Sequence, residues 1–131
     1  EELHDFLTLV LANNAMGVCL SGNGEFEKAL SCFEKALGIN VMANVQWGIV
    51  AIKGNLVSWV YCLLGNVELA YQTSQEALRI ANESGDIFSK ALANDALGLS
   101  YYLKGFIKEA EEHLLKAVGF LQKSKQLAYA A

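Results

Sequence analysis

Histidine and cysteine are the residues in this sequence best suited to metal binding or nucleophilic chemistry. The two histidines, His4 and His113, belong to no motif such as HExxH and occupy unrelated places along the chain. We therefore expect exposed histidines on helices rather than a metal site or a catalytic pair. The three cysteines, Cys19, Cys32 and Cys62, form no CxxC pair, and their odd number argues against a disulfide framework or a zinc site.

Free cysteines commonly behave as small buried hydrophobic residues, so core packing is the first expectation for all three. Cys19 and Cys62 lie near the ends of two similar segments, offset by two residues, and a redox pair is the alternative. Free thiols fit a reducing compartment best, so we expect a cytoplasmic protein.

No loop typical of phosphate binding or acyl transfer occurs in the sequence. The Walker A loop, the GxGxxG loop and the GxSxG elbow are absent, and the glycines of Gly22-Asn23-Gly24 join two predicted helices. Glu109, Glu111 and Glu112 are neighbours on one predicted helix, where a solvated face is the simplest interpretation. The sequence therefore predicts no enzyme, no bound metal and no cofactor.

Composition and charge restrict the classes of partner. The chain has 131 residues, of which 53% are hydrophobic and 18% charged, and its net charge is −4 at pH 7. Nucleic acids and anionic membranes select for basic surfaces, so we expect neither as a partner. Residues 6–22 carry no charge, but this stretch is slightly short for a membrane span and has Asn13-Asn14 at its centre. We see no signal peptide, and the missing initial Met suggests a piece of a longer protein.

Apolar residues at helical spacing predict helices that follow one another in pairs. The predicted helices cover residues 3–20, 25–39, 46–64, 68–83, 87–103 and 106–123. Residues 40–44 read as a connector, and residues 124–131 as the start of a seventh helix. Ser84-Gly85 is typical of a helix end, and Asp86 of the N-cap that follows it.

The paired helices carry an internal repeat. Three glycines recur at intervals of about 40 residues, the first interval being slightly the longer, and two sets of alanines keep the same spacing. These residues are Gly24, Gly65 and Gly105; Ala29, Ala70 and Ala110; and Ala36, Ala77 and Ala117. Glycine permits the positive φ of a tight reversal between helices, and alanines two helical turns apart lie on one helix face, where they allow close approach.

The first and third copies resemble the tetratricopeptide repeat. The matching positions are Gly17, Leu20, Gly24, Phe26, Ala29, Phe33 and Ala36, and then Gly98, Tyr101, Gly105, Ile107, Ala110, Leu114 and Ala117. The middle copy is looser, with Ser58 and Ser74 at two of these positions. The resemblance implies an all-α, right-handed superhelix of antiparallel helix pairs, with six to seven helices. It would form one domain, residues 1–131, with repeats at about 10–43, 51–84 and 91–124.

A repeat of this family usually has about 34 residues, and the longer spacing here is similar to repeats of bacterial signalling ATPases, LuxR-type regulators and cyclases. The resemblance places the first helix of each pair on the concave side. These helices are nearly free of charge, so we expect an apolar groove. The candidate groove positions are Leu11, Val18, Leu56, Trp59, Leu63, Leu92, Leu99 and Tyr102.

Asn14, Asn55 and Asp95 share one column of the repeat when positions are counted from the turn glycines. A row of amides along a groove can hold the backbone of an extended peptide. Bonds between helices are the alternative, and the sequence leaves both open.

The predicted function is a protein-interaction scaffold that binds a peptide or an amphipathic helix, with Trp59, Tyr61, Tyr101 and Tyr102 as anchors. The first alternative is homo-oligomerisation through an uncapped end. The residues of that end are Leu114, Leu115, Val118 and Leu121. The second alternative is a small-molecule sensor domain.

Overall fold

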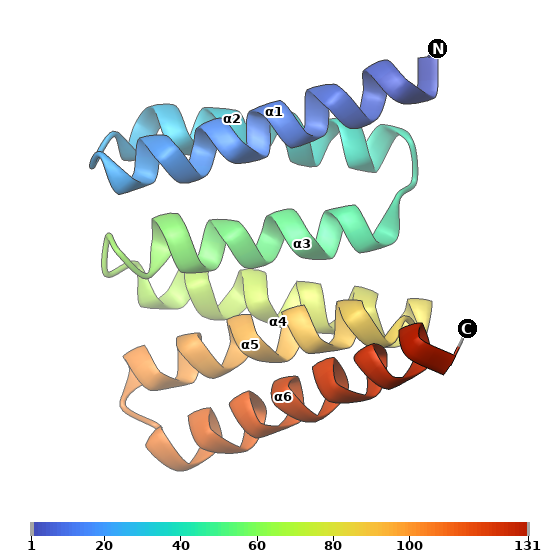
Figure 1. Cartoon of the computed structure of the whole chain (residues 1–131). Coiled ribbons are helices and arrows are strands. Elements are labelled where there is room, and N and C mark those ends of the chain that lie inside the picture. The colour runs from blue at the N-terminus through green and yellow to red at the C-terminus, as the bar shows by residue number, and fades with distance from the viewer. Residues whose placement is uncertain (1, 131) are drawn as a thin grey trace.

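A computed structural model describes residues 2–130 of the chain, and the side chains of residues 5–130. Within this range the chain forms helices and short turns and no strand (Figure 1). The elements are α1 (Glu2–Gly22), α2 (Phe26–Met42), α3 (Gln46–Leu56), η1 (Val57–Tyr61), α4 (Val67–Ser84), α5 (Ile87–Lys104) and α6 (Ile107–Ala130). η1 is a π-helical segment that continues α3. The predicted all-α class is confirmed, and the side chain of His4 lies outside the described residues.

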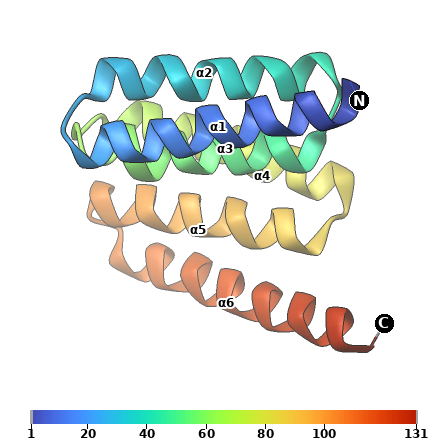
Figure 2. The same ribbon diagram turned by 45° about the horizontal axis from the view of Figure 1, so that its top comes forward.

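Successive helices pack as pairs, α1 with α2, α3 and η1 with α4, and α5 with α6 (Figures 1 and 2). The first helices of the pairs also contact one another, through α3 with α5 and through η1 with both α1 and α5. No comparable contact joins α2 to α4 or α4 to α6 within residues 2–130. The first helices are therefore closer together than the second, and the stack curves with α1, α3 and α5 on its inner side. This arrangement is the predicted superhelix of helix pairs.

Each helix pair turns at a glycine in the left-handed region of backbone conformation. The φ angles are +79° at Gly24, +70° at Gly65 and +85° at Gly105. A residue with a Cβ is strained there, whereas glycine is not. The three repeat glycines are thus confirmed as turn residues. Gly85, with φ of +73°, ends α4 in the same way, and Asp86 caps α5, as the sequence predicts.

Small residues let the two helices of a pair approach closely. The six repeat alanines, Ala29, Ala36, Ala70, Ala77, Ala110 and Ala117, are at most 4% exposed. A Cβ on Gly17 would lie 2.8 Å from the ring of Phe33, and one on Gly98 would lie 2.7 Å from Leu114 Cγ. These contacts explain why the first and third pairs combine a glycine on the first helix with a large residue on the second.

In the middle pair, the first helix carries the large residue and the second helix the small one. Val57 of η1 is fully buried in a cluster with Ala70 and Ala96. Ser74 of α4 is equally buried, and its hydroxyl group contacts Ala70 O at 2.6 Å and Ser100 Oγ at 2.7 Å. Here the larger side chain comes from the first helix and the small one from the second, which accounts for the looser match of this copy.

The π segment η1 explains why the interval from Gly24 to Gly65 is longer than the interval from Gly65 to Gly105. Before η1, the buried residues of α3 are separated by the longer interval from buried residues of α5, and within η1 the shorter interval also joins buried residues. Examples are Trp47 and Phe88 (exposed), Gly48 and Ser89 (buried), Ile52 and Ala93 (buried) and, within η1, Val60 and Ser100 (buried). A π turn holds one residue more than an α turn, so η1 accommodates the additional residue within the helix.

Two predicted boundaries were wrong. Asn40 was expected to begin a connector, but it lies buried in α2, where its Nδ2 donates to Ala36 O at 3.0 Å. Gly48 of α3 makes room for Asn40, because a side chain on Gly48 would collide with its amide. The expected seventh helix is instead the end of α6, which continues to Ala130 because no glycine or proline follows Lys123.

Candidate partner-binding surface

Four aromatic side chains are exposed on the inner side of the stack. Trp47 of α3 is 50% exposed and Trp59 of η1 38%, while Phe88 and Tyr102 of α5 are 44% and 61% exposed. Aromatic side chains are usually largely buried, and exposed apolar groups that gather on one surface mark interaction sites. We call the exposed inner side of α1, α3, η1 and α5 the inner surface.

The predicted groove positions divide between this surface and the core. Leu11 and Leu63 are exposed, and Val18, Leu92 and Leu99 are half-buried. Leu56 was misplaced, because it is only 3% exposed and packs in the core of the first two pairs. Counting back from Gly65 put Leu56 in the groove, since the glycine spacing reveals an additional residue in this repeat but not its location in η1.

Asn14 and Asn55 bond to each other across α1 and α3. Asn55 Nδ2 donates to Asn14 Oδ1 at 2.6 Å, and both side chains are half-buried. Because η1 contains one additional residue, residues of α3 before η1 correspond to α5 by the longer interval. Asn55 is therefore equivalent to Ala96, and Gly54 is equivalent to Asp95. The three residues therefore do not form one row. A role of this column in holding a peptide stays a prediction, as does that of the other predicted groove residues.

Asp95 is exposed on the inner surface of α5. The atoms that crowd its carboxyl group raise its pKa, because they displace part of the water that stabilises the charge. It gives a largely apolar surface one acidic group.

Tyr61 and Tyr101 were expected on the inner surface, but both are half-buried. Tyr61 packs against the core. Tyr101 stacks on His113 of α6, with ring centroids 5.4 Å apart. Its hydroxyl group lies 3.4 Å from that of Tyr71 on α4. Tyr101 therefore joins the second and third pairs on the outer side.

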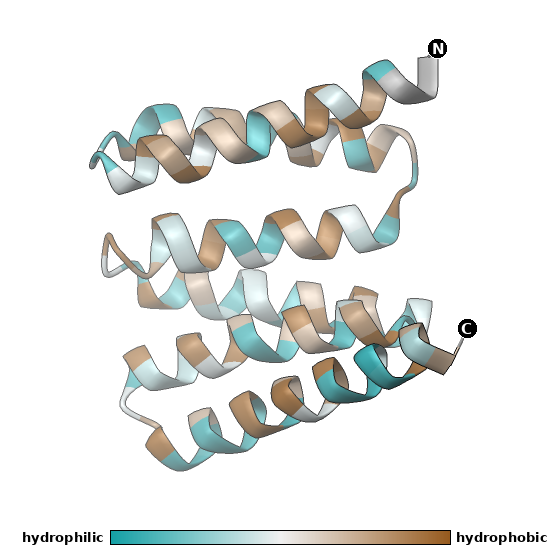
Figure 3. Ribbon diagram, in the orientation of Figure 1, coloured by the Kyte–Doolittle hydropathy of each residue, from teal (hydrophilic) through white to brown (hydrophobic). Residues whose placement is uncertain are grey.

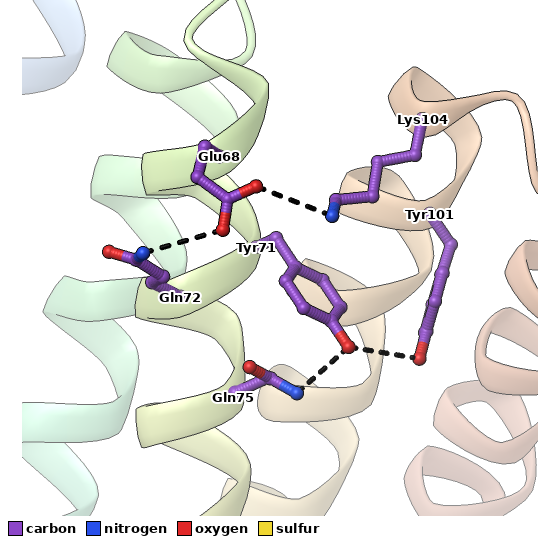
Figure 4. A network of polar contacts seen from close by, with 6 residues as sticks. All are labelled: Glu68, Tyr71, Gln72, Gln75, Tyr101 and Lys104. Carbon is purple, nitrogen blue, oxygen red and sulfur yellow. Dashed lines mark hydrogen bonds and ion pairs between the residues drawn. The ribbon is translucent and has the colours of Figure 1, made fainter.

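Tyr71 organises the polar contacts around this outer junction (Figure 4). Gln75 Nε2 donates to Tyr71 Oη at 2.9 Å. Lys104 Nζ lies 4.0 Å from the centre of the Tyr71 ring and 3.5 Å from Glu68 Oε2. This network ties α4 to α5.

His113 was expected to be exposed, and this was wrong. It is half-buried beside Tyr101, and its Nδ1 lies 2.9 Å from Asn94 Oδ1. Asn94 Nδ2 donates to Lys90 O, so Asn94 Oδ1 is left to accept and His113 Nδ1 carries the proton. Burial lowers the pKa of His113, Lys116 lowers it further, and Glu112 opposes both.

A cleft of about 750 Å³ lies where the connectors before α3 and α5 come side by side. Trp47 and Phe88 line it, together with Asp86. A hydrogen bond from the Ser89 hydroxyl group lowers the pKa of Asp86. Trp47 and Phe88 were not among the predicted groove residues. Their shared place at the second position of α3 and α5, one repeat interval apart, could have indicated them.

The residues first considered for chemistry lie apart. Among residues 5–130, no group of three or more His, Cys, Asp or Glu side chains could hold a metal ion. All three cysteines are free, and Cys19 is exposed, so core packing was wrong for this residue. Burial raises the pKa of the Cys62 thiol. Glu109, Glu111 and Glu112 are exposed, as expected.

Helix α1 is long and apolar enough over Asp5–Gly22 to cross a membrane by length and composition alone. Such a segment is weak evidence for a span, because core helices and signal sequences have the same properties. In the structure α1 packs along α2 and bonds to α3 through Asn14.

Residues 11–40 match the family model of the tetratricopeptide repeat, which covers most of α1 and α2. The chain contains a tetratricopeptide repeat. Searches of curated proteins and of solved structures found no match. The other two helix pairs repeat the turn glycines and buried alanines of the matched pair, and their similarity to a tetratricopeptide repeat rests on these residues.

Tetratricopeptide repeats generally mediate protein–protein interaction, and they are typically not catalytic. The features that define the repeat, Gly17, Gly24, Ala29 and Ala36, all lie within the matched residues. They serve the packing of the helices and the turn between them.

Proposed function

We propose that this chain is a protein-interaction module whose inner surface holds an amphipathic helix or a peptide of a partner protein. The observation that carries the proposal is the exposure of Trp47, Trp59, Phe88 and Tyr102 on that surface. Tryptophan and tyrosine supply a large share of the binding energy at protein interfaces. The tetratricopeptide repeat supports the same class of function.

The chemistry of the inner surface defines the partner. Its aromatic and aliphatic side chains favour an apolar face, and Asp95 favours a hydrogen-bond donor or a cation opposite it. Lys53 is the one charged residue of residues 46–64, and its Nζ is paired with Glu76 Oε2 of α4 at 2.7 Å. An amphipathic helix could contact the apolar side chains through its apolar stripe and Asp95 through a basic or amide residue beside that stripe.

Selected peptides provide a test that requires no known partner. Helical peptides would be selected from a display library on the immobilised chain and measured by isothermal titration calorimetry. Replacing Trp59 and Tyr102 together with Ala should weaken binding at least about thirtyfold, because each removes an exposed aromatic anchor. Circular dichroism should show unchanged helicity, since neither side chain is buried.

A matched control is Tyr129→Ala, which removes an aromatic side chain that is 81% exposed near the end of α6. Its affinity for the selected peptides should equal that of the unaltered chain. Peptides that bind the Trp59 and Tyr102 double variant with undiminished affinity would show that the inner surface is not the binding site.

We further propose that the module works in the cytoplasm, within a larger bacterial signalling or regulatory protein. The repeat spacing of about 40 residues supports this setting, since it resembles the long repeats of such proteins. The three free cysteines support a reducing compartment. An ATPase, cyclase or DNA-binding module in the parent chain would agree with the proposal, whereas a secretion signal would contradict it.

A further inference from the structure

One face of α1 exposes small and apolar side chains, although the same face is buried in α5 and buried or half-buried in α3. On α1 this face includes Ala12, Ala15, Met16 and Cys19, all of them exposed. Met16 is 54% exposed, whereas the equivalent residues Leu56 and Leu97 are 3% exposed. We call this the α1 face. No charged residue occurs between Asp5 and Glu25, so the α1 face is also uncharged.

The internal contacts of the chain show what such a face binds. Ile52, Leu56 and Val60 of α3 and η1 pack in one cluster with Phe33 and Ala36 of α2. In α5, Ala93 packs in a cluster with Ala77 and Ala81 of α4, and Ala96 packs with Ala70. This face of a first helix is therefore the one that packs on the second helix of the preceding pair.

The opposite end of the stack exposes the receiving half of that contact. On α6, Ile107 is 58% exposed, Val118 50% and Leu121 45%. The residues equivalent to them in α2 and α4 are half-buried or buried by the next pair. Ile107, Leu114, Leu115 and Val118 of α6 line a mainly apolar cleft of about 400 Å³, and Tyr102 of α5 forms its border with the inner surface. We call this the α6 face, and Figure 3 shows hydrophobic residues along both terminal helices.

We propose that the chain associates head to tail, with the α6 face of one copy bound to the α1 face of a second copy. In a longer parent chain, a neighbouring helix pair of the same kind would cover these faces instead. Within the chain, α3 packs on α2 and α5 packs on α4. The α1 face and the α6 face are the two sides of the same kind of contact, and both are exposed. Ala12 and Ala15 leave room for larger side chains of α6, such as Leu114 and Val118. The uncharged α1 face brings no like charge towards Glu111 in the cleft. A contact between two different faces is heterologous, so it adds copies without a fixed end point.

Two variants of the full chain test this contact. Ala15→Glu places a charge on the α1 face, and Val118→Glu places one on the α6 face, both at exposed positions that should not disturb folding. In sedimentation velocity, the average mass of the unaltered chain should rise steadily with concentration. Each variant should remain monomeric, with affinity reduced at least about a hundredfold, because a charge would be desolvated in the contact.

Mixing the two variants provides the decisive measurement. Each variant keeps one intact face, so the mixture should form a one-to-one dimer and nothing larger. Gln122→Glu is the control, because its position is exposed on α6 and the equivalent Val41 and Asn82 are also exposed. This control should associate like the unaltered chain, and circular dichroism should show all variants folded.

Three results would overturn the proposal. The first is an unaltered chain that stays monomeric at every concentration. The second is a mixture that does not dimerise, or a single variant that still dimerises on its own, which indicates contacts between like faces. The third is a monomer whose α1 face binds vesicles of phosphatidylcholine and phosphatidylglycerol, with binding lost in Ala15→Glu.

Discussion

Two buried serines differ in whether their hydroxyl groups have partners. Ser21 near the end of α1 is 3% exposed, and its Oγ has no hydrogen-bond partner among the described residues. Ser74 of α4 is fully buried, and its Oγ can donate its one proton to Ala70 O, at 2.6 Å, while it accepts from Ser100 Oγ, at 2.7 Å. The same residue type therefore costs free energy at one position and stabilises the fold at the other.

Alanine substitutions should reveal this difference. Ser21→Ala should leave the free energy of unfolding unchanged or raise it by up to about 1 kcal/mol, because it removes an unpaired polar group. Ser74→Ala should lower it by about 1–2 kcal/mol, because it removes satisfied hydrogen bonds between α4 and α5. Urea unfolding followed by circular dichroism measures both, and equal effects of the two substitutions would contradict this account.

His113 should make stability depend on pH. Its pKa in the folded chain lies below the ordinary value of 6.5, mainly because of burial. As pH falls through about 6.5, the unfolded chain takes up a proton before the folded chain does, so unfolding becomes easier. The contribution of His113 is thus complete above that pH and declines as the pH approaches the lower pKa of the folded state.

The variant His113→Gln separates this effect from other titrations. Unfolding free energies of both chains would be measured from pH 7.5 to pH 5. The unaltered chain should lose more stability than the variant over this range, since glutamine does not titrate. Parallel curves would mean that the imidazole proton is not coupled to folding.

At the scale of the helix, the additional residue in η1 predicts that one residue can be deleted there without loss of the fold. The repeat that contains η1 is one residue longer than the next, and burial before η1 matches α5 only when that residue is counted. Deleting Ser58 should convert η1 to a regular α-helical turn, while the buried face of α3 keeps its orientation. We expect a folded chain with unfolding free energy within about 1 kcal/mol of the original, as for a surface change.

Deleting Asp95 is the matched control in α5, which has no π segment. Asp95 is exposed, so its deletion removes no core side chain. The deletion would instead rotate one half of α5 by about 100° relative to the other, because an α-helix makes one full turn every 3.6 residues. The loss should exceed about 3 kcal/mol, since buried alanines and leucines leave the core. Similar losses in the two deletions, measured by urea unfolding, would refute the interpretation of η1.

For the whole molecule, the repeat made most of the fold predictable. Gly24, Gly65 and Gly105 recur because each turn requires a positive φ, and the six alanines recur because each helix pair requires close approach. Such requirements leave the same residue type at the same spacing. Helix order and pairing followed from these residues, whereas the inner side of the stack was implied by the resemblance to the tetratricopeptide repeat.

The candidate site was less predictable, because exposure depends on the orientation of each helix. The residues of η1 do not differ in type from those of an ordinary helix, so counting from Gly65 misplaced Leu56 and Asn55 by one position. Trp47 and Phe88 were missed because they lie far from the glycines used for counting. His113 and Tyr101 form a contact between helices that no local pattern indicates.

The placement of the tryptophans has a spectroscopic consequence. The sequence contains two tryptophans, and both Trp47 and Trp59 lie partly exposed on the inner surface. The tryptophan fluorescence of the unlabelled chain therefore originates on that surface. A partner that covers it should shift the emission to shorter wavelengths, whereas head-to-tail contacts through α1 and α6 should leave the emission unchanged. One emission spectrum thus reports which of the two surfaces is occupied.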